Sequence, residues 1–278
     1  MKKINRRSFL AAAGLTAAAL ALTACGGSAS STASSTASSA ASSEAASTSA
    51  AAELTTVEAG KLTMATNATF PPYEMTTDSG EIEGIDVDTA KAIAEKLGLE
   101  LQIDDMDFDA ALLSVQQGKA DIVMAGVTVT DERKAVMDFS DSYATGIQSI
   151  IGPEGSDITS PDDLAGKKIG TQRGTTGYIY CSDDFGDDAV VAYDDGLTAV
   201  QALNNGQVDA VVIDNAPAKE FVAANPGLVI LDTSYAEEDY AIGLAKGSAL
   251  EDAVNAALEE LKADGTLQSI VDKYITAE

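Results

Sequence analysis

One short stretch of the sequence combines groups that could bind an anion. Ala125–Arg133 reads Ala-Gly-Val-Thr-Val-Thr-Asp-Glu-Arg. The apolar run before it predicts a buried strand that stops at Gly126, and Thr130 is a suitable N-cap for a helix that begins with two acids. Arg133 then lies in the first helical turn, where a cation faces the positive end of the helix dipole. Its guanidinium, the N–H groups of the turn and the Thr128 hydroxyl would together suit a carboxylate.

The alternative for Arg133 is a surface ion pair. Asp131 and Glu132 precede it directly, and the chain contains 44 acidic residues. These nine residues alone leave the two interpretations open.

The N-terminus has the features of an export signal. Four basic residues, Lys2, Lys3, Arg6 and Arg7, precede the apolar segment Phe9–Leu22. The sequence Leu-Thr-Ala-Cys that ends at Cys25 resembles a lipobox, at which a lipoprotein signal is cleaved before a lipid-bearing cysteine. This resemblance implies a signal peptide over 1–24 and lipidation of Cys25. A partial twin-arginine pattern leaves the export route open, and an uncleaved signal anchor is the alternative.

A low-complexity segment follows the cysteine. Gly26–Ala52 contains only Gly, Ser, Thr and Ala apart from Glu44, so it has almost nothing to bury. We therefore predict a flexible tether over 25–53. No later stretch reaches the roughly 18 consecutive apolar residues of a membrane span. We expect the rest of the chain to be extracytoplasmic and held at the membrane, on its periplasmic or cell-surface side, by the lipid at Cys25.

The charge of the chain is strongly one-sided. Loss of the four basic residues of the signal from a total of 17 leaves 13 basic against 44 acidic residues, a formal net charge of −31. Such a surface repels nucleic acid and anionic lipid headgroups, so we expect neither as a partner.

Missing residue types and motifs argue against several kinds of chemistry. The chain has no histidine, which removes the commonest general base and metal ligand. Its two cysteines are Cys25 and Cys181, so no intramolecular disulfide is expected if Cys25 carries lipid. Neither a Gly-x-Ser-x-Gly elbow nor a phosphate P-loop occurs. We expect no catalytic residue, metal or cofactor.

Strand and helix patterns alternate after the tether, which predicts an α/β fold with parallel sheets. The predicted strands are Leu62–Thr66, Leu99–Ile103, Ala120–Ala125, Lys168–Thr171, Val190–Tyr193, Val208–Ile213, Val229–Leu231 and Tyr240–Leu244. The predicted helices are Asp88–Leu97, Phe108–Gln117, a helix start at Gly177–Cys181, Leu197–Asn204, Ala216–Ala224, Leu250–Asp264 and Leu267–Thr276. Ligands of open α/β sheets bind beyond the carboxyl ends of strands. Three segments meet that condition: Asn67–Tyr73, Gly126–Arg133 and Asp214–Pro217.

Several motifs in order resemble one known family. These are Ala65–Glu74, Gly84–Asp88, Asp107–Ala110, the Gly126–Arg133 turn, Asp138–Tyr143 and Gly174–Gly177. Together they resemble the extracytoplasmic solute-binding proteins of amino-acid ABC importers, bacterial family 3, over Lys61–Tyr274. The resemblance implies a periplasmic-binding-protein-like fold of type II, with two hinge strands between two lobes. Lobe 1 would cover 60–144 plus 241–278, and lobe 2 would cover 145–240.

The resemblance also implies roles for individual residues. Arg133, the Thr128 amide and an amide at Thr175 or Thr176 would bind the α-carboxylate of an L-amino acid. Asp214 would bind the α-ammonium, with the Gly126 carbonyl and the Thr128 hydroxyl sharing it. Phe70 and Phe108 would enclose the ligand side chain. The structural alternatives are helix caps for Asp214 and for the Gly174–Gly177 turn, and core packing for the two phenylalanines.

The implied ligand and partners follow from the same resemblance. Asn67 is neutral where some relatives carry an acid, and Gln172 supplies a neutral amide where others carry a lysine. The expected ligand is a free L-amino acid, with a weak preference for polar or basic ones. The expected partners are an ABC permease and its ATPase subunits, and we expect a monomer. The alternatives are an enzyme of dehydratase-like or lytic type on the same fold, or a ligand-binding sensor module.

Overall fold

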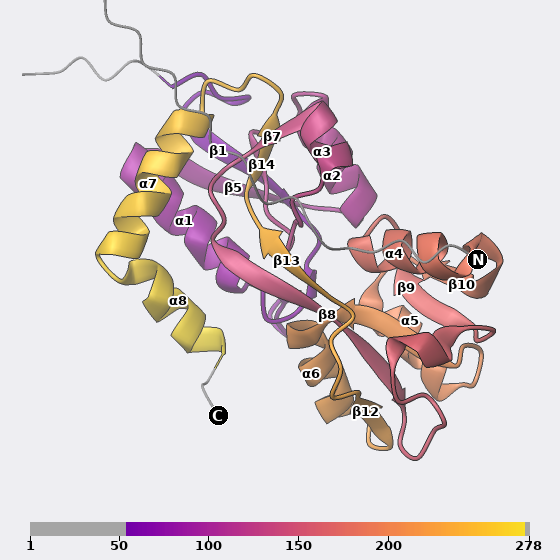
Figure 1. Cartoon of the computed structure of the whole chain (residues 1–278). Helices are drawn as coiled ribbons and strands as arrows, with labels where there is room; N and C mark the ends of the chain where they lie inside the picture. Colours follow the sequence, from indigo (N-terminus) through magenta and orange to yellow (C-terminus); the bar gives the residue numbers. More distant parts are fainter. Residues whose placement is uncertain (1–53, 276–278) are drawn as a thin grey trace, which may run out of the picture. The chain divides into compact units, whose positions relative to one another are not determined.

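A computed structural model describes residues 54–275 (Figure 1). The predictions for the signal peptide, for Cys25 and for the tether therefore lie outside the described residues. The helices are α1 (Ile85–Leu97), α2 (Phe108–Gln116), α3 (Asp131–Val136), α4 (Thr176–Phe185), α5 (Gly196–Asn204), α6 (Asn215–Ala224), α7 (Glu251–Ala263) and α8 (Thr266–Tyr274), with 3-10 turns η1 (Pro161–Leu164) and η2 (Asp187–Ala189). Within 54–275, no helix is both long and apolar enough to cross a membrane.

The first sheet has the strand order β5-β1-β6-β14-β7. Its strands are β1 (Lys61–Thr66), β5 (Glu100–Asp105), β6 (Ile122–Val123), β7 (Met137–Phe139) and β14 (Gly243–Ala245). β1 is parallel to β5 and β6, whereas β14 is antiparallel to β6 and β7. A small antiparallel sheet, β2 (Thr69–Phe70), β3 (Glu74–Thr76) and β4 (Ile82–Glu83), lies between β1 and α1 in the sequence.

The second sheet has the order β10-β9-β11-β8-β12, and β13 also pairs with β8. Its strands are β8 (Ala144–Pro153), β9 (Ile169–Gln172), β10 (Val190–Tyr193), β11 (Ala210–Asp214), β12 (Leu228–Ile230) and β13 (Ala236–Tyr240). Side chains of β11 alternate between two cores: Val211 and Ile213 pack with α5 and α6, while Ala210 and Val212 pack with Cys181 of α4. This is the pattern of a sheet that is covered by helices on both faces.

Two segments lead from one sheet to the other. Four residues separate the end of β7 from the start of β8. β13 runs antiparallel beside β8, with Tyr240 opposite Ala144. After β13, Ala241 and Ile242 are buried and lead directly into β14 of the first sheet. The two crossing segments therefore lie side by side, as Figure 1 shows.

The structure differs from the sequence prediction in the direction of its strands and in strands that were not predicted, β8 among them. The sheets are mixed rather than parallel, because the crossing strands β8 and β13 are antiparallel neighbours and no helix separates β7 from β8. The single strand predicted over Tyr240–Leu244 is two strands in different sheets, since β13 ends at Tyr240 and β14 begins at Gly243. The predicted helices and most of the predicted strands lie where the sequence predicts them. Cys181 is buried and forms no disulfide among the described residues.

Candidate binding site

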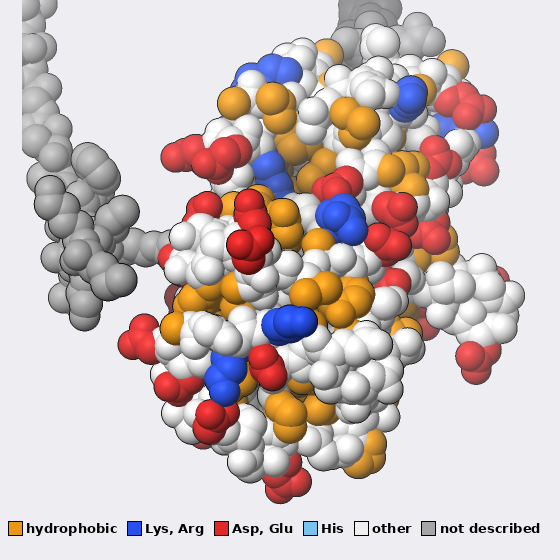
Figure 2. All heavy atoms as spheres, turned by 90° about the vertical axis from the view of Figure 1, so that its right-hand side faces the viewer, with side chains coloured by type: hydrophobic (Ala, Val, Ile, Leu, Met, Phe, Trp, Pro, Cys, Tyr) orange, Lys and Arg blue, Asp and Glu red, His pale blue; other side chains and the backbone are white. Residues whose placement is uncertain are grey.

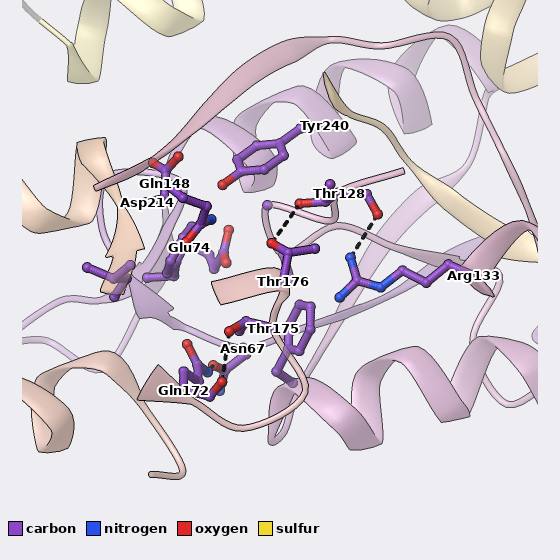
Figure 3. Close-up of a pocket in the computed structure, with 15 residues that line it drawn as sticks. Asn67, Glu74, Thr128, Arg133, Gln148, Gln172, Thr175, Thr176, Asp214 and Tyr240 are labelled. Atoms are coloured by element: carbon purple, nitrogen blue, oxygen red, sulfur yellow. Dashed lines mark hydrogen bonds between the residues drawn. The ribbon is translucent and has the colours of Figure 1, made fainter. Parts of the chain in front are cut away.

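A cavity lies where strand ends of both sheets meet (Figure 3). All nine residues predicted as ligand contacts line it: Phe70, Phe108, Gly126, Thr128, Arg133, Gln172, Thr175, Thr176 and Asp214. Six others complete the wall: Asn67, Glu74, Ala125, Gln148, Ile213 and Tyr240. The structure thus brings together every predicted contact, although they span nearly 150 positions of the chain.

Arg133 is buried, with only 8% of its surface exposed. Thr130 caps α3 by accepting the N–H of Arg133 at 3.1 Å, as the sequence predicts. The guanidinium donates from Nη1 to the Thr128 carbonyl at 2.8 Å and from Nη2 to the Gly174 carbonyl at 3.1 Å. Its carbon also lies 5.4 Å from the centre of the Phe108 ring. The surface ion pair considered for Arg133 is therefore wrong.

The contacts of Arg133 leave a buried positive charge without an anion. Among residues 54–275, no carboxylate forms an ion pair with this guanidinium. Burial lowers the pKa of Arg133, and the more distant charge of Glu238 partly offsets this. A buried cation is costly unless an anion compensates it. The cavity beside Arg133 is therefore well suited to a carboxylate.

Gly126 is the position where backbone conformation matters most. Its φ is +55°, and a Cβ there would lie 2.8 Å from Cε1 of Phe70 and 3.2 Å from the Tyr240 ring. Its N–H donates to Oδ2 of Asp86 at 2.9 Å. A glycine thus lets the turn pass close beneath two aromatic rings.

The turn that precedes α4 brings the second sheet to Arg133. Thr175 is the N-cap of α4, and its hydroxyl accepts the N–H of Tyr178 at 3.4 Å. The helix-cap interpretation of this turn is therefore correct. It does not exclude a ligand, because Thr176 follows at the first helical position, whose N–H has no acceptor within the helix.

Asp214 lies across the cavity from Arg133 (Figure 3). Its carboxylate caps α6 by accepting the Ala216 N–H at 3.0 Å, and it accepts the Ile147 N–H at 2.7 Å. The cap considered for Asp214 is thus present. Each oxygen accepts one backbone N–H, and the Tyr240 hydroxyl also forms a hydrogen bond with this carboxylate. Burial raises the pKa of Asp214 to about 6, and the two backbone N–H groups oppose this rise.

A bridge of neutral amides closes another side of the cavity. Gln172, at the end of β9, donates from Nε2 to Oδ1 of Asn67 at 2.8 Å, and Asn67 donates to the Met106 carbonyl at 3.0 Å. These two side chains come from different sheets. The wall they form is polar without net charge.

Two buried acids near the site were not among the nine predicted ligand contacts. Glu74 is fully buried on β3, and neither of its carboxyl oxygens has a hydrogen-bond partner within 54–275. Burial, and then the charge of Asp86, raise the pKa of Glu74 well above its ordinary value. Glu238 on β13 is 6% exposed and accepts hydrogen bonds from residues that line the cavity. Its position two residues before the buried Tyr240 on one strand was the signal that could have revealed it.

Within 54–275, no group of three or more metal-ligating side chains is close enough to hold an ion. Figure 2 shows Asp and Glu side chains spread over the face that it draws, with Lys and Arg between them rather than gathered into one basic patch.

The sequence of the chain is similar to those of known binding proteins. The sequence model of the bacterial extracellular solute-binding proteins, family 3, matches residues 62–277. The L-cystine-binding protein TcyJ of Escherichia coli is 34% identical over 226 residues, which cover 80% of this chain and 85% of that protein. The arginine-binding extracellular protein ArtP of Bacillus subtilis is 34% identical over 230 residues, which cover 78% of this chain and 87% of that protein.

The structural comparison agrees. The arginine-, lysine-, histidine-binding protein ArtJ of Geobacillus stearothermophilus superposes with a TM-score of 0.75 at 34% identity, covering 78% of this chain and 96% of that one. These relatives are binding proteins, which supports a solute-binding component and does not favour an enzyme. The α/β fold is that of type II periplasmic binding proteins, as predicted. The chain belongs to the bacterial extracellular solute-binding proteins, family 3.

Proposed function

We propose that the chain is the substrate-binding component of an ABC importer and that it captures a free L-amino acid in the cavity between two lobes. The observation that carries this proposal is Arg133, a buried cation with no carboxylate partner among residues 54–275, across the cavity from the buried carboxylate of Asp214. An α-amino acid is a small zwitterion, with a carboxylate for the first group and an ammonium for the second. The carboxylate would accept charge-assisted hydrogen bonds from Arg133, and the ammonium would donate one to Asp214.

The remaining contacts complete the proposed site. The amides of Thr128 and Thr175 or Thr176 would join Arg133 on the carboxylate, and the Gly126 carbonyl and the Thr128 hydroxyl would join Asp214 on the ammonium. The side chain would lie among Phe70, Phe108 and Gln172.

The proposed lobes are 60–144 plus 241–278 and 145–240. The pairing of β8 with β13 supports two hinge strands near 144 and 240. Because ligand groups come from both sheets, closure would be favoured only when the ligand contacts both at once.

We propose a basic amino acid as the preferred ligand. Arg133 and the acids Asp214 and Glu238 are buried at or beside the cavity, and a further buried acid, Glu74, also lines it. An additional positive charge on the ligand side chain would improve this balance, since buried charges need compensation. ArtP and ArtJ, named for basic amino acids, support this choice, whereas TcyJ, named for cystine, marks the polar alternative.

A thermal-shift panel tests the proposed function. The chain without residues 1–24 is heated with each of the twenty L-amino acids at millimolar concentration. We expect arginine or lysine to raise the melting temperature most, because a ligand of the native state stabilises it by RT ln(1 + [L]/Kd). A flat panel would refute amino-acid binding, and a response to polar amino acids alone would refute only the basic class.

We also propose that the protein is a monomeric lipoprotein, anchored at Cys25 outside the cytoplasm and working with a permease and ATPase subunits. The lipobox-like sequence supports the anchor. Cys25→Ala is expected to leave the protein uncleaved or to release it into the soluble fraction, as measured by cell fractionation and immunoblotting. A cleaved Cys25→Ala product that stays membrane-bound would contradict the anchor.

A further inference from the structure

Glu238 accepts hydrogen bonds from three side chains that line the cavity. Its Oε2 accepts the Thr128 hydroxyl at 3.1 Å and the Thr176 hydroxyl at 2.9 Å. The same oxygen accepts Nε2 of Gln148 at 3.0 Å. All three donors line the cavity, but Glu238 itself does not, so it lies directly behind them.

This arrangement fixes where the hydroxyl protons of the cavity point. A threonine hydroxyl has one proton and two lone pairs. When the protons of Thr128 and Thr176 are both directed at Glu238, their oxygens can act only as acceptors elsewhere. The two oxygens lie 3.5 Å apart, at the limit of a hydrogen bond. The hydroxyl of Thr128 therefore offers a lone pair to a positive group.

The orientation of the Gln148 amide is fixed in the same way. Its Nε2 is bound to Glu238, so its oxygen points elsewhere, and a Cβ on Gly177 would lie 2.9 Å from that oxygen. Gly177 thus leaves room for the amide oxygen.

The backbone of Thr128 lies beside the group that is proposed to bind the carboxylate. Its carbonyl accepts the Arg133 guanidinium at 2.8 Å, on the side where the proposed carboxylate would bind. The Thr176 hydroxyl is occupied by Glu238, which leaves the helix-terminal N–H of Thr176 for the carboxylate. The two ends of an amino acid would therefore meet groups of opposite polarity on either side of Thr128.

We propose that Glu238 is a positioning residue for the α-ammonium: by holding the Thr128 and Thr176 hydroxyl protons and the Gln148 amide, it makes this corner of the cavity an acceptor. The inference rests on the proposed function. Glu238 acts through Thr128 and does not itself contact the ligand.

The test compares L-arginine with 5-guanidinopentanoate, which is arginine without its α-amino group. Glu238→Gln keeps the shape but removes the charge and introduces a donor that can reverse the hydroxyls. We expect calorimetry to show L-arginine affinity reduced about ten- to a hundredfold, the range for a hydrogen bond to a charged group. The affinity for 5-guanidinopentanoate should change by less than about twofold, since it makes no ammonium contact. Glu237→Gln, an exposed acid on the same strand, is the matched control and should change neither.

Two further variants keep the inference falsifiable if Glu238→Gln does not fold. Thr128→Ser retains the acceptor and should bind L-arginine nearly as well as the wild type. Thr128→Val should lose the preference for L-arginine over its analogue. Equal weakening of both compounds by Glu238→Gln, or no weakening, would overturn the inference. If the thermal-shift panel identifies an amino acid other than arginine, that amino acid and its analogue without the α-amino group replace L-arginine and 5-guanidinopentanoate in this test. A panel in which no amino acid raises the melting temperature would refute the proposed function and this inference together.

Discussion

Arg133→Ala is expected to weaken binding of the preferred amino acid by about 2–5 kcal/mol, the usual cost of removing one partner of a buried charge pair. The variant would leave the ligand carboxylate desolvated with only backbone N–H groups as donors. It would also leave the Thr128 and Gly174 carbonyls without the donors that they have now. Isothermal calorimetry measures the change in Kd.

A nearby exposed arginine provides the control. The side chain of Arg173 is 57% exposed and lies 3.8 Å from Asp194. Arg173→Ala removes the same charge from the same region and should leave Kd within about twofold, because exposed ion pairs contribute little. Wild-type affinity in Arg133→Ala would contradict the carboxylate assignment.

Asp214→Asn is expected to have the second largest effect, again about 2–5 kcal/mol in binding, because it removes the charge opposite the ligand ammonium. The structure adds a cost to folding. Both Asp214 oxygens accept backbone N–H groups, and asparagine has one oxygen, so either the Ala216 or the Ile147 N–H loses its acceptor. We expect a loss of about 1 kcal/mol in unfolding free energy.

Asp195→Asn is the matched control for Asp214→Asn. Asp195 caps α5, a helix that packs on the same sheet as α6, by accepting the Thr198 N–H at 2.7 Å. Asp195 does not line the cavity. It should change the melting temperature slightly and the Kd not at all. Melting curves and calorimetry on both variants separate the cap from the ligand role. Unchanged affinity in Asp214→Asn would leave Asp214 as a cap alone.

The Asp214 variant should also change the pH profile. Because burial raises the pKa of Asp214 to about 6, with Glu238 adding to the rise, the empty site takes up a proton there as the pH falls through 6. Wild-type affinity should therefore fall between pH 7 and pH 5. The stability contribution has the opposite sign, since a raised acid pKa favours the folded state at low pH and is lost as the pH rises. In Asp214→Asn the part of the affinity profile that Asp214 causes should disappear.

Much of the fold could be predicted from local features of the sequence. The end of α1 at Gly98, the cap of α3 at Thr130 and the amphipathic α7 each follow from residue type and spacing within one or two turns. β8 was missed because Gln148 and Ser149 are buried in its centre, at 4% and 2% exposure, and interrupt the apolar pattern. Strand direction depends on pairings with distant segments, so local patterns could not give it.

The site likewise contains residues that could be predicted from local sequence and one whose role could not. Arg133 and Asp214 could be predicted because each follows a strand and begins a helix, a place where ligands commonly bind. For Glu238, the alternation with the buried Tyr240 could indicate burial but not a role at the site, because its partners Thr128 and Thr176 lie 110 and 62 residues away in the chain. Its exposed neighbours Glu237 and Asp239 also make the segment resemble a solvated acidic run.

A crystal structure of the chain with the amino acid that stabilises it most would test the central claim most directly. We predict one ligand in the cavity, with its carboxylate on the Arg133 guanidinium, its ammonium on Asp214 and the Thr128 hydroxyl, and its side chain beside Phe70 and Phe108. A ligand bound elsewhere, or bound with its two ends exchanged, would contradict the account.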